Sequence, residues 1–149
     1  MRREPVFEWN EENGQAYCVI TDNKNRMFIG MATCHPDDAD MQSRRTGEEI
    51  AFRRARIENL RAVRSDLNNE LRALNQLYYS MKSSTRFNPK SYENIMLQRR
   101  IRATTFDLTT VKEMLATERE NLRNLIQEKD KFYNQIRAHR NKANSIKEN

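Results

Sequence analysis

Apolar residues recur at alternating intervals of three and four positions along two long stretches of the chain, which is the spacing of helices that pack side by side. The first stretch runs from Thr46 to Ser83 and the second from Pro89 to Ile146. A heptad pattern kept over so many turns predicts a coiled coil. The seam positions hold Ile50, Ile57, Leu60, Leu67, Leu71, Leu74, Tyr78 and Met81, and then Leu97, Ile101, Leu108, Val111, Leu115, Leu122, Leu125, Phe132 and Ile136.

The ends of these helices carry their own signals. Thr46-Gly47-Glu48-Glu49 matches a capping box, with a threonine cap and a glutamate three residues later. Asn88-Pro89 matches a helix restart, with asparagine as the cap and proline at the first helical position. We therefore expect helices over residues 46–83 and 89–146 that form an antiparallel hairpin. The numbers of facing residues then sum to about 172, so Glu118 should face Arg53 and Arg54.

Shorter runs with turn signals between them fill the N-terminal part of the chain. Asn13-Gly14 suits a tight turn, because both residue types accept positive φ angles. The predicted fold class is α+β: a small three-stranded antiparallel β-meander head with an acidic connector (residues 1–45), then a long antiparallel two-helix coiled-coil hairpin (residues 46–149). Three runs rich in β-branched and aromatic residues predict the strands: Val6–Trp9, Gln15–Thr21 and Arg26–Cys34.

A sheet of three strands is marginal alone and has to bury one face. Its nearest apolar partners are the start of the first helix, around Ile50, Phe52 and Ile57, and the distal part of the second helix. Gly30 predicts either a bulge or a point of close contact in the third strand. The sheet residues expected in this core are Trp9, Tyr17, Phe28 and Ile29.

Charge is distributed unevenly over a polar chain. Of the 149 residues, 32% are charged and 37% hydrophobic, which suits a hairpin that buries only a narrow seam. Residues 1–46 hold six basic and eight acidic side chains, whereas the rest of the chain holds 21 basic and 13 acidic side chains. The helical part is therefore basic, and this favours an acidic or nucleic-acid partner.

Two clusters of arginine are the candidate residues for binding a partner or phosphate. Arginine in place of lysine favours bidentate contacts with phosphate or carboxylate groups. Aromatic residues for base stacking are sparse, because the first cluster contains only Phe52. The predicted site residues are Arg44, Arg45, Arg53, Arg54, Arg56, Arg61, Arg99, Arg100 and Arg102.

Charged residues also interrupt the apolar seams, among them Arg53 and Glu118. We interpret them as residues that fix the register of the two helices, in preference to an active site. The seams are equally able to pair between chains, so a homo-oligomer through exposed helix faces stays open. Several apolar residues outside the seams need the head, a second copy or a target to cover them: Val63, Leu77, Tyr79, Ile95, Met96, Phe106 and Met114.

Catalytic and metal-binding patterns are weak. Cys34-His35 with Asp37 and Asp38 suggests a metal site, but the spacing matches no standard zinc arrangement. We expect Cys34 to be a small buried strand residue. No nucleophile–histidine pair and no phosphate-binding glycine loop are visible, so the sequence predicts a protein that is not an enzyme and takes no metal or cofactor.

Localisation follows from what the chain lacks. No apolar run approaches the length of a membrane span, and the N-terminus has no apolar signal core. Two cysteines without a leader fit a reducing compartment in which both thiols are free. We therefore expect a cytoplasmic protein with no membrane partner.

One segment resembles small accessory proteins encoded by phages or mobile elements. The similar residues are Gly30–Asp38 (G-M-A-T-C-H-P-D-D), Thr46–Ala51 (T-G-E-E-I-A) and Arg53-Arg54-Ala55. These proteins share a strand, a C-H-P-D-D connector and a helix that opens with E-x-G-x-x-[IL]-A, although Arg45 precedes Thr46 here. The resemblance covers residues 26–57. It implies a phage context, in which small helical proteins inhibit host defence complexes, CRISPR nucleases included.

Three functions are expected. The leading hypothesis is a non-catalytic, phage-encoded interaction protein that binds and inhibits a larger host protein or protein–nucleic-acid complex, in the manner of an anti-CRISPR protein in the host cytoplasm. The second is direct nucleic-acid binding by the arginine-rich helix faces. The third is a structural coiled-coil oligomer, such as a virion or scaffold component.

Overall fold

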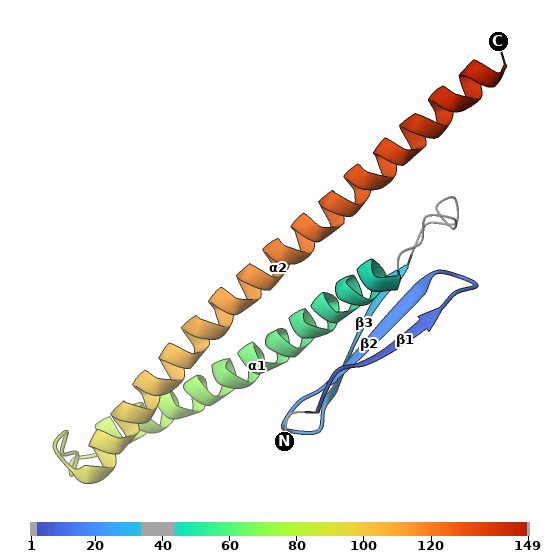
Figure 1. Cartoon of the computed structure of the whole chain (residues 1–149). Coiled ribbons are helices and arrows are strands. Elements are labelled where there is room, and N and C mark those ends of the chain that lie inside the picture. The colour runs from blue at the N-terminus through green and yellow to red at the C-terminus, as the bar shows by residue number, and fades with distance from the viewer. Residues whose placement is uncertain (1–2, 34–43, 149) are drawn as a thin grey trace. The chain divides into compact units, whose positions relative to one another are not determined.

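The computed structural model describes residues 3–33 and 44–148. The strands form one antiparallel sheet in the order β1-β2-β3, and two long helices follow it. This confirms the predicted α+β fold, a three-stranded meander and then a helical hairpin. The elements in Figure 1 are β1 (Val6–Asn10), β2 (Gln15–Thr21), β3 (Met27–Thr33), α1 (Arg44–Lys82) and α2 (Tyr92–Lys147).

The chain divides into two compact units. The first unit holds the sheet, the start of α1 as far as Asn59 and the part of α2 from Thr117 onward. The second unit, residues 60–116, holds the remainder of both helices and the turn that joins them. Each long helix therefore contributes to both units.

The sheet has a continuous register, in which Cys18 lies between Phe7 of β1 and Gly30 of β3. Two residues at the turns adopt positive φ angles. Gly14 has a φ of 63°, which glycine adopts without steric cost, as predicted, but its neighbour Asn13 does not adopt a positive φ. Asn25 has a φ of 60° in the second turn, where asparagine tolerates the left-handed conformation better than most residues.

Asp22 organises the second turn. Its Oδ1 accepts hydrogen bonds from the backbone N–H groups of Lys24 and Arg26, each at 2.9 Å, and its Oδ2 pairs with Arg26 Nε at 2.8 Å. Desolvation raises the pKa of Asp22, but these hydrogen bonds and the charge of Arg26 outweigh it and leave the pKa lowered. The ionised carboxylate therefore stabilises the turn above its unfolded pKa, and this contribution is lost as the pH falls through the folded pKa.

Small residues line the sheet face that packs on α1. Ala16, Cys18 and Ala32 are buried against Ala51 and Ala55 of α1. Burial, with a smaller effect from the nearby carboxylate of Glu48, raises the pKa of the Cys18 thiol and keeps it protonated. The larger side chains that pack around this centre are Trp9, Ile20, Ile50, Phe52, Leu122, Leu125 and Ile126.

Gly30 is the point of closest approach between β3 and α1. A Cβ atom at Gly30 would lie 1.8 Å from the backbone oxygen of Ala51 and 2.5 Å from the backbone nitrogen of Ala55. The predicted close contact is therefore confirmed, and the unbroken pairing of β2 with β3 excludes the alternative of a bulge. No residue other than glycine fits between the two backbones.

The predicted sheet core was only partly right. Trp9 packs against the buried cluster, as expected. Ile29 is 61% exposed, so its predicted burial is wrong. The reason is strand alternation: since Gly30 faces α1, its neighbour Ile29 points to the opposite side of the sheet. Tyr17 lies on that same outer side, paired with Met31.

Both helices begin at residues other than those predicted. The first starts at Arg44, so Thr46 lies inside its first turn. The second starts at Tyr92, because Asn88, Pro89 and Lys90 form a separate turn in which Asn88 Oδ1 accepts the Lys90 N–H at 3.0 Å. Ser91 is the cap of this helix, and its Oγ accepts the N–H of Asn94 at 3.3 Å.

Replacement of Ser91 by alanine should destabilise the second unit by about 1 kcal/mol, because the helix start loses its cap and Asn94 loses a side-chain partner. Asn94 is 3% exposed, and its Nδ2 donates to Ser91 Oγ at 2.9 Å and to the Asn88 carbonyl at 2.6 Å. Urea denaturation followed by circular dichroism would measure the change. Ser80→Ala, at an exposed position within α1, is the control and should change little; equal effects would contradict the assignment of the cap.

The predicted connector lies outside the described residues. It includes Cys34, His35, Asp37 and Asp38, which the sequence raised as a weak metal site. Within residues 3–33 and 44–148, no group of three or more His, Cys, Asp and Glu side chains is arranged to hold a metal ion.

Candidate functional site

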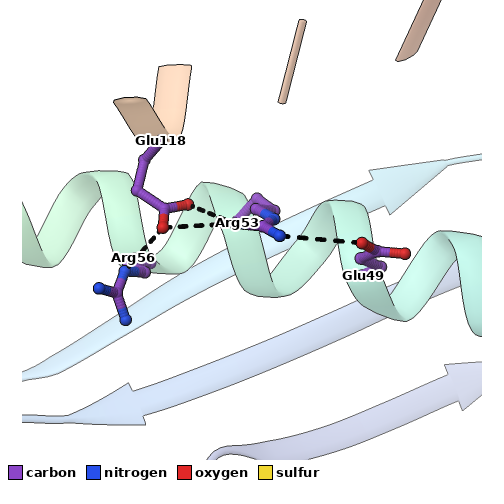
Figure 2. Close-up of polar contacts among 4 residues, drawn as sticks. All are labelled: Glu49, Arg53, Arg56 and Glu118. Carbon is purple, nitrogen blue, oxygen red and sulfur yellow. Dashed lines mark hydrogen bonds and ion pairs between the residues drawn. The ribbon is translucent and has the colours of Figure 1, made fainter. Parts of the chain in front are cut away.

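A buried carboxylate, Glu118 of α2, binds two arginines of α1 within the first unit. Its oxygens accept hydrogen bonds from Arg53 Nη1 at 3.0 and 3.3 Å, and Arg56 Nε lies 2.9 Å from Oε1 (Figure 2). Arg53 also lies 3.9 Å from Glu49, one turn earlier in α1. Glu118 is 8% exposed, so these guanidinium groups replace the water that its charge would otherwise need.

This Glu118 cluster confirms the predicted facing of Glu118 and Arg53. It also gives Arg53 and Arg56 a structural role, because breaking a buried ion pair leaves an uncompensated charge. Their role in binding a partner stays a prediction. The side chain of Arg53 is 27% exposed and that of Arg56 is 40% exposed, so the two paired guanidinium groups retain only part of their surface for another contact.

The other arginines near the start of α1 differ in their surroundings. Arg44 pairs with Glu48 at 2.9 Å, one turn later in the helix. Arg54 donates to the carbonyl of Met31 in β3 at 2.6 Å, so it ties α1 to the outer edge of the sheet. Arg45 and Arg61 are exposed on α1.

The second arginine cluster lies in the second unit, on α2. Arg100 pairs with Glu70 of α1, and this contact agrees with the register that Arg53 and Glu118 show in the first unit. Arg99 and Arg102 are exposed, and neither bonds to a carboxylate among the described residues. The structure therefore separates Arg100, which joins the helices, from two arginines that face outward.

Positive charge gathers in the part of the second unit around the turn. Residues 71–106 contain seven lysines and arginines but a single acidic residue, Glu93. Within the described chain, six of the seven cations have no carboxylate partner, and all six are exposed. They are Arg72, Lys82, Arg86, Lys90, Arg99 and Arg102. We call residues 71–106 the basic end of the hairpin.

Large apolar side chains share an exposed face of α2 with these arginines. Five exposed residues between positions 92 and 106 each lie two positions from a buried residue of α2. Two positions correspond to about 200° of rotation around the helix, so the five residues lie on the side opposite the buried ones. Tyr92 is 73% exposed, Ile95 39% and Phe106 71%. We call this set the outward stripe: Tyr92, Ile95, Arg99, Arg102 and Phe106.

Sequence reasoning found part of this face. It selected Arg99 and Arg102 by composition, and Ile95 and Phe106 as apolar residues outside the seam. It did not include Tyr92, although this residue lies within the helix predicted over residues 89–146. The signal was present, since Tyr92 continues the three–four spacing of the stripe by one step.

No helix of the described residues combines the length and the apolar character that crossing a lipid bilayer requires. No protein-family model, curated protein or solved structure matches this chain.

Proposed function

We propose that the protein acts by binding rather than by catalysis, and that the basic end of the hairpin is its contact surface for an acidic macromolecule. The observation that carries the proposal is the set of six exposed cations without carboxylate partners among the described residues. Like charges gathered in one part of a molecule repel each other, and an acidic partner relieves that repulsion.

The proposed target is a host complex that handles nucleic acid, such as a defence nuclease, which the protein would bind and inhibit. This target class comes from the resemblance of residues 26–57 to phage accessory proteins. The chemistry of the surface is compatible with it, because such complexes present both phosphate groups and protein carboxylates. Exposed aromatic and arginine side chains are also the residue types that contribute most to binding at protein interfaces.

Direct nucleic-acid binding is the second candidate, and one specific observation favours it. Unlike the arginine cluster at the start of α1, the basic end places exposed aromatic rings, Tyr79, Tyr92 and Phe106, among its cations. Aromatic rings between cations suit single strands, since bases stack on the rings while the cations contact phosphates.

The experiment compares the wild-type chain with the double variant Arg99→Glu, Arg102→Glu. We expect the variant to recover at least about tenfold less of its target from host lysate, measured by quantitative mass spectrometry, because two contacts become repulsive. The matched control, Arg119→Glu with Lys131→Glu, makes the same change in charge at exposed positions of α2 in the first unit. Equal recovery by the two double variants would contradict the proposal.

Fluorescence anisotropy distinguishes the two candidates. Labelled single-stranded and duplex oligonucleotides are titrated with the wild-type chain at several salt concentrations. Direct binding predicts an affinity that falls steeply with salt, because each phosphate contact releases a counterion. If no oligonucleotide binds at low salt, the second candidate is excluded and a protein surface is the remaining target.

A further inference from the structure

The sheet has an outer face that the described chain leaves uncovered. β-strand alternation places Val6, Val19 and Ile29 in one row across the three strands, with Tyr17 and Met31 in the next row. Val6 is 65% exposed, Ile29 61% and Met31 45%. Exposed apolar patches of this kind mark contact surfaces.

Acidic residues gather around β1, on this outer face and next to it. Residues 4–21, which include β1 and β2, contain four glutamates and no lysine or arginine. Glu8 lies on the outer face itself, paired with Tyr17, and the other glutamates precede β1 or occupy its turn. A ligand of this face should therefore be apolar and basic.

The outward stripe of the second unit is both apolar and basic, and its length matches that of the strands. Tyr92 to Phe106 is a rise of about 21 Å along a helix, and the seven residues of β3 span about 20 Å. Three strands are about as wide as one helix with its side chains. The inner face of the sheet packs against α1, whereas the outer-face residues Val6 and Ile29 stay exposed in the described chain.

We propose that the outward stripe of one copy packs on the outer sheet face of a second copy. The apolar side chains Tyr92, Ile95 and Phe106 pack along the strands, on the apolar residues of the outer face. Arg99 and Arg102 lie among the glutamates of β1 and its turn. The contact joins two different surfaces, so the assembly is head-to-tail. A dimer still offers one free stripe and one free face, so the assembly either grows as an open chain or closes as a ring.

This self-association goes beyond the proposed function and competes with it, because both use Arg99 and Arg102. The contact is small, since one helix on three strands buries less than about 1,200 Å² in total, which is typical of weak complexes. We therefore expect association at micromolar to millimolar concentrations, so that a tighter partner releases the single chain.

Analytical ultracentrifugation of the full chain is the first test. The weight-average mass of the wild type should rise above 17.8 kDa, the mass of one chain, as its concentration increases. The variant Arg99→Glu, Arg102→Glu should stay at the mass of one chain over the same range. So should the variant Ile29→Gln, Met31→Gln, which removes apolar side chains from the outer face. The control Arg119→Glu, Lys131→Glu should associate like the wild type.

Mixing the two defective variants is the decisive test. The first retains an intact sheet face and the second an intact stripe, so a head-to-tail contact predicts a capped 1:1 dimer of twice the single-chain mass. Circular dichroism first establishes that both variants are folded. A wild type that stays at the mass of one chain overturns the inference, and so does a mixture of folded variants that does not combine.

The outcome is separable from that of the proposed function. The sheet variant keeps the whole basic end, so it should recover the target as well as the wild type does. If association is absent but recovery persists, only self-association is excluded. If association behaves as expected but Arg99→Glu, Arg102→Glu recovers the target normally, only the proposed function is excluded.

Discussion

Replacing Gly30 with alanine is expected to destabilise the first unit by about 3 kcal/mol or more. The added methyl group would lie 1.8 Å from the backbone oxygen of Ala51 and 2.5 Å from the backbone nitrogen of Ala55. Backbone atoms of a packed helix cannot rotate away as a side chain does, so β3 and α1 would have to separate. Separation would also expose the alanines and Cys18 that fill the space between them.

Urea denaturation followed by the fluorescence of Trp9 would measure this loss. Trp9 is the one tryptophan in the chain and packs against the buried cluster, so its signal reports on the first unit. A local probe is needed because a chain with two units need not unfold in one step.

Gly47→Ala is the matched control. Its Cβ would lie 3.2 Å from the Trp9 ring and from the Ala16 Cβ, so the neighbours need to move by only a few tenths of an ångström. Alanine also favours the helix by about 1 kcal/mol relative to glycine, which offsets this crowding. We expect Gly47→Ala to remain within about 1 kcal/mol of the wild type. Equal losses for both variants would contradict the account of Gly30.

Glu118→Gln should destabilise the protein by about 2 kcal/mol. The substitution keeps the shape of the side chain but removes the charge that Arg53 and Arg56 share. The loss is smaller than for a fully buried pair, because Arg56 is 40% exposed and solvent screens part of the interaction. The same urea titration would measure it.

Glu120→Gln provides the comparison on the same helix. Glu120 pairs with Arg123 at 2.6 Å, but both side chains are more than half exposed. Exposed pairs contribute about 0–1 kcal/mol, so this variant should be close to the wild type. If both substitutions have the same effect, burial does not determine the importance of the Glu118 cluster.

Much of the fold could be predicted from the amino-acid sequence. The heptad spacing predicted two helices, and the turn between them set the register that places Glu118 beside Arg53. Turn chemistry predicted the meander, because Gly14 accepts a backbone angle that most residues avoid. These features depend on neighbours within a few positions, or on a repeat kept over many turns, and both are visible in a sequence.

The buried centre of the first unit could not be predicted from the sequence in the same way. It consists of Ala16, Cys18, Gly30 and Ala32, which give almost no hydrophobic signal, whereas Ile29 gives a strong one and is exposed. Two large residues, Tyr17 and Ile29, were therefore assigned to the wrong face. The pairing register and the close approach of Gly30 to Ala51 show that Gly30 faces α1. Its neighbour Ile29 therefore faces the other way.

The candidate site shows the same limit for charge. The sequence identified nine arginines by composition, and the predicted register placed a carboxylate, Glu118, opposite Arg53 but gave no partner for Arg100. Arg53, Arg56 and Arg100 pair with glutamates of the other helix. Such pairs join residues far apart in the chain, so they appear only when the helices are placed side by side.

The contact between β3 and α1 through glycine and alanine affects how this protein should be mutated. Alanine scanning finds core residues by truncating side chains, and here there is almost nothing to truncate. Such a scan would pass over the centre of the first unit and report its periphery as the core. Substitutions that enlarge side chains, applied along residues 16–18, 30–32 and 51–55, are the informative survey.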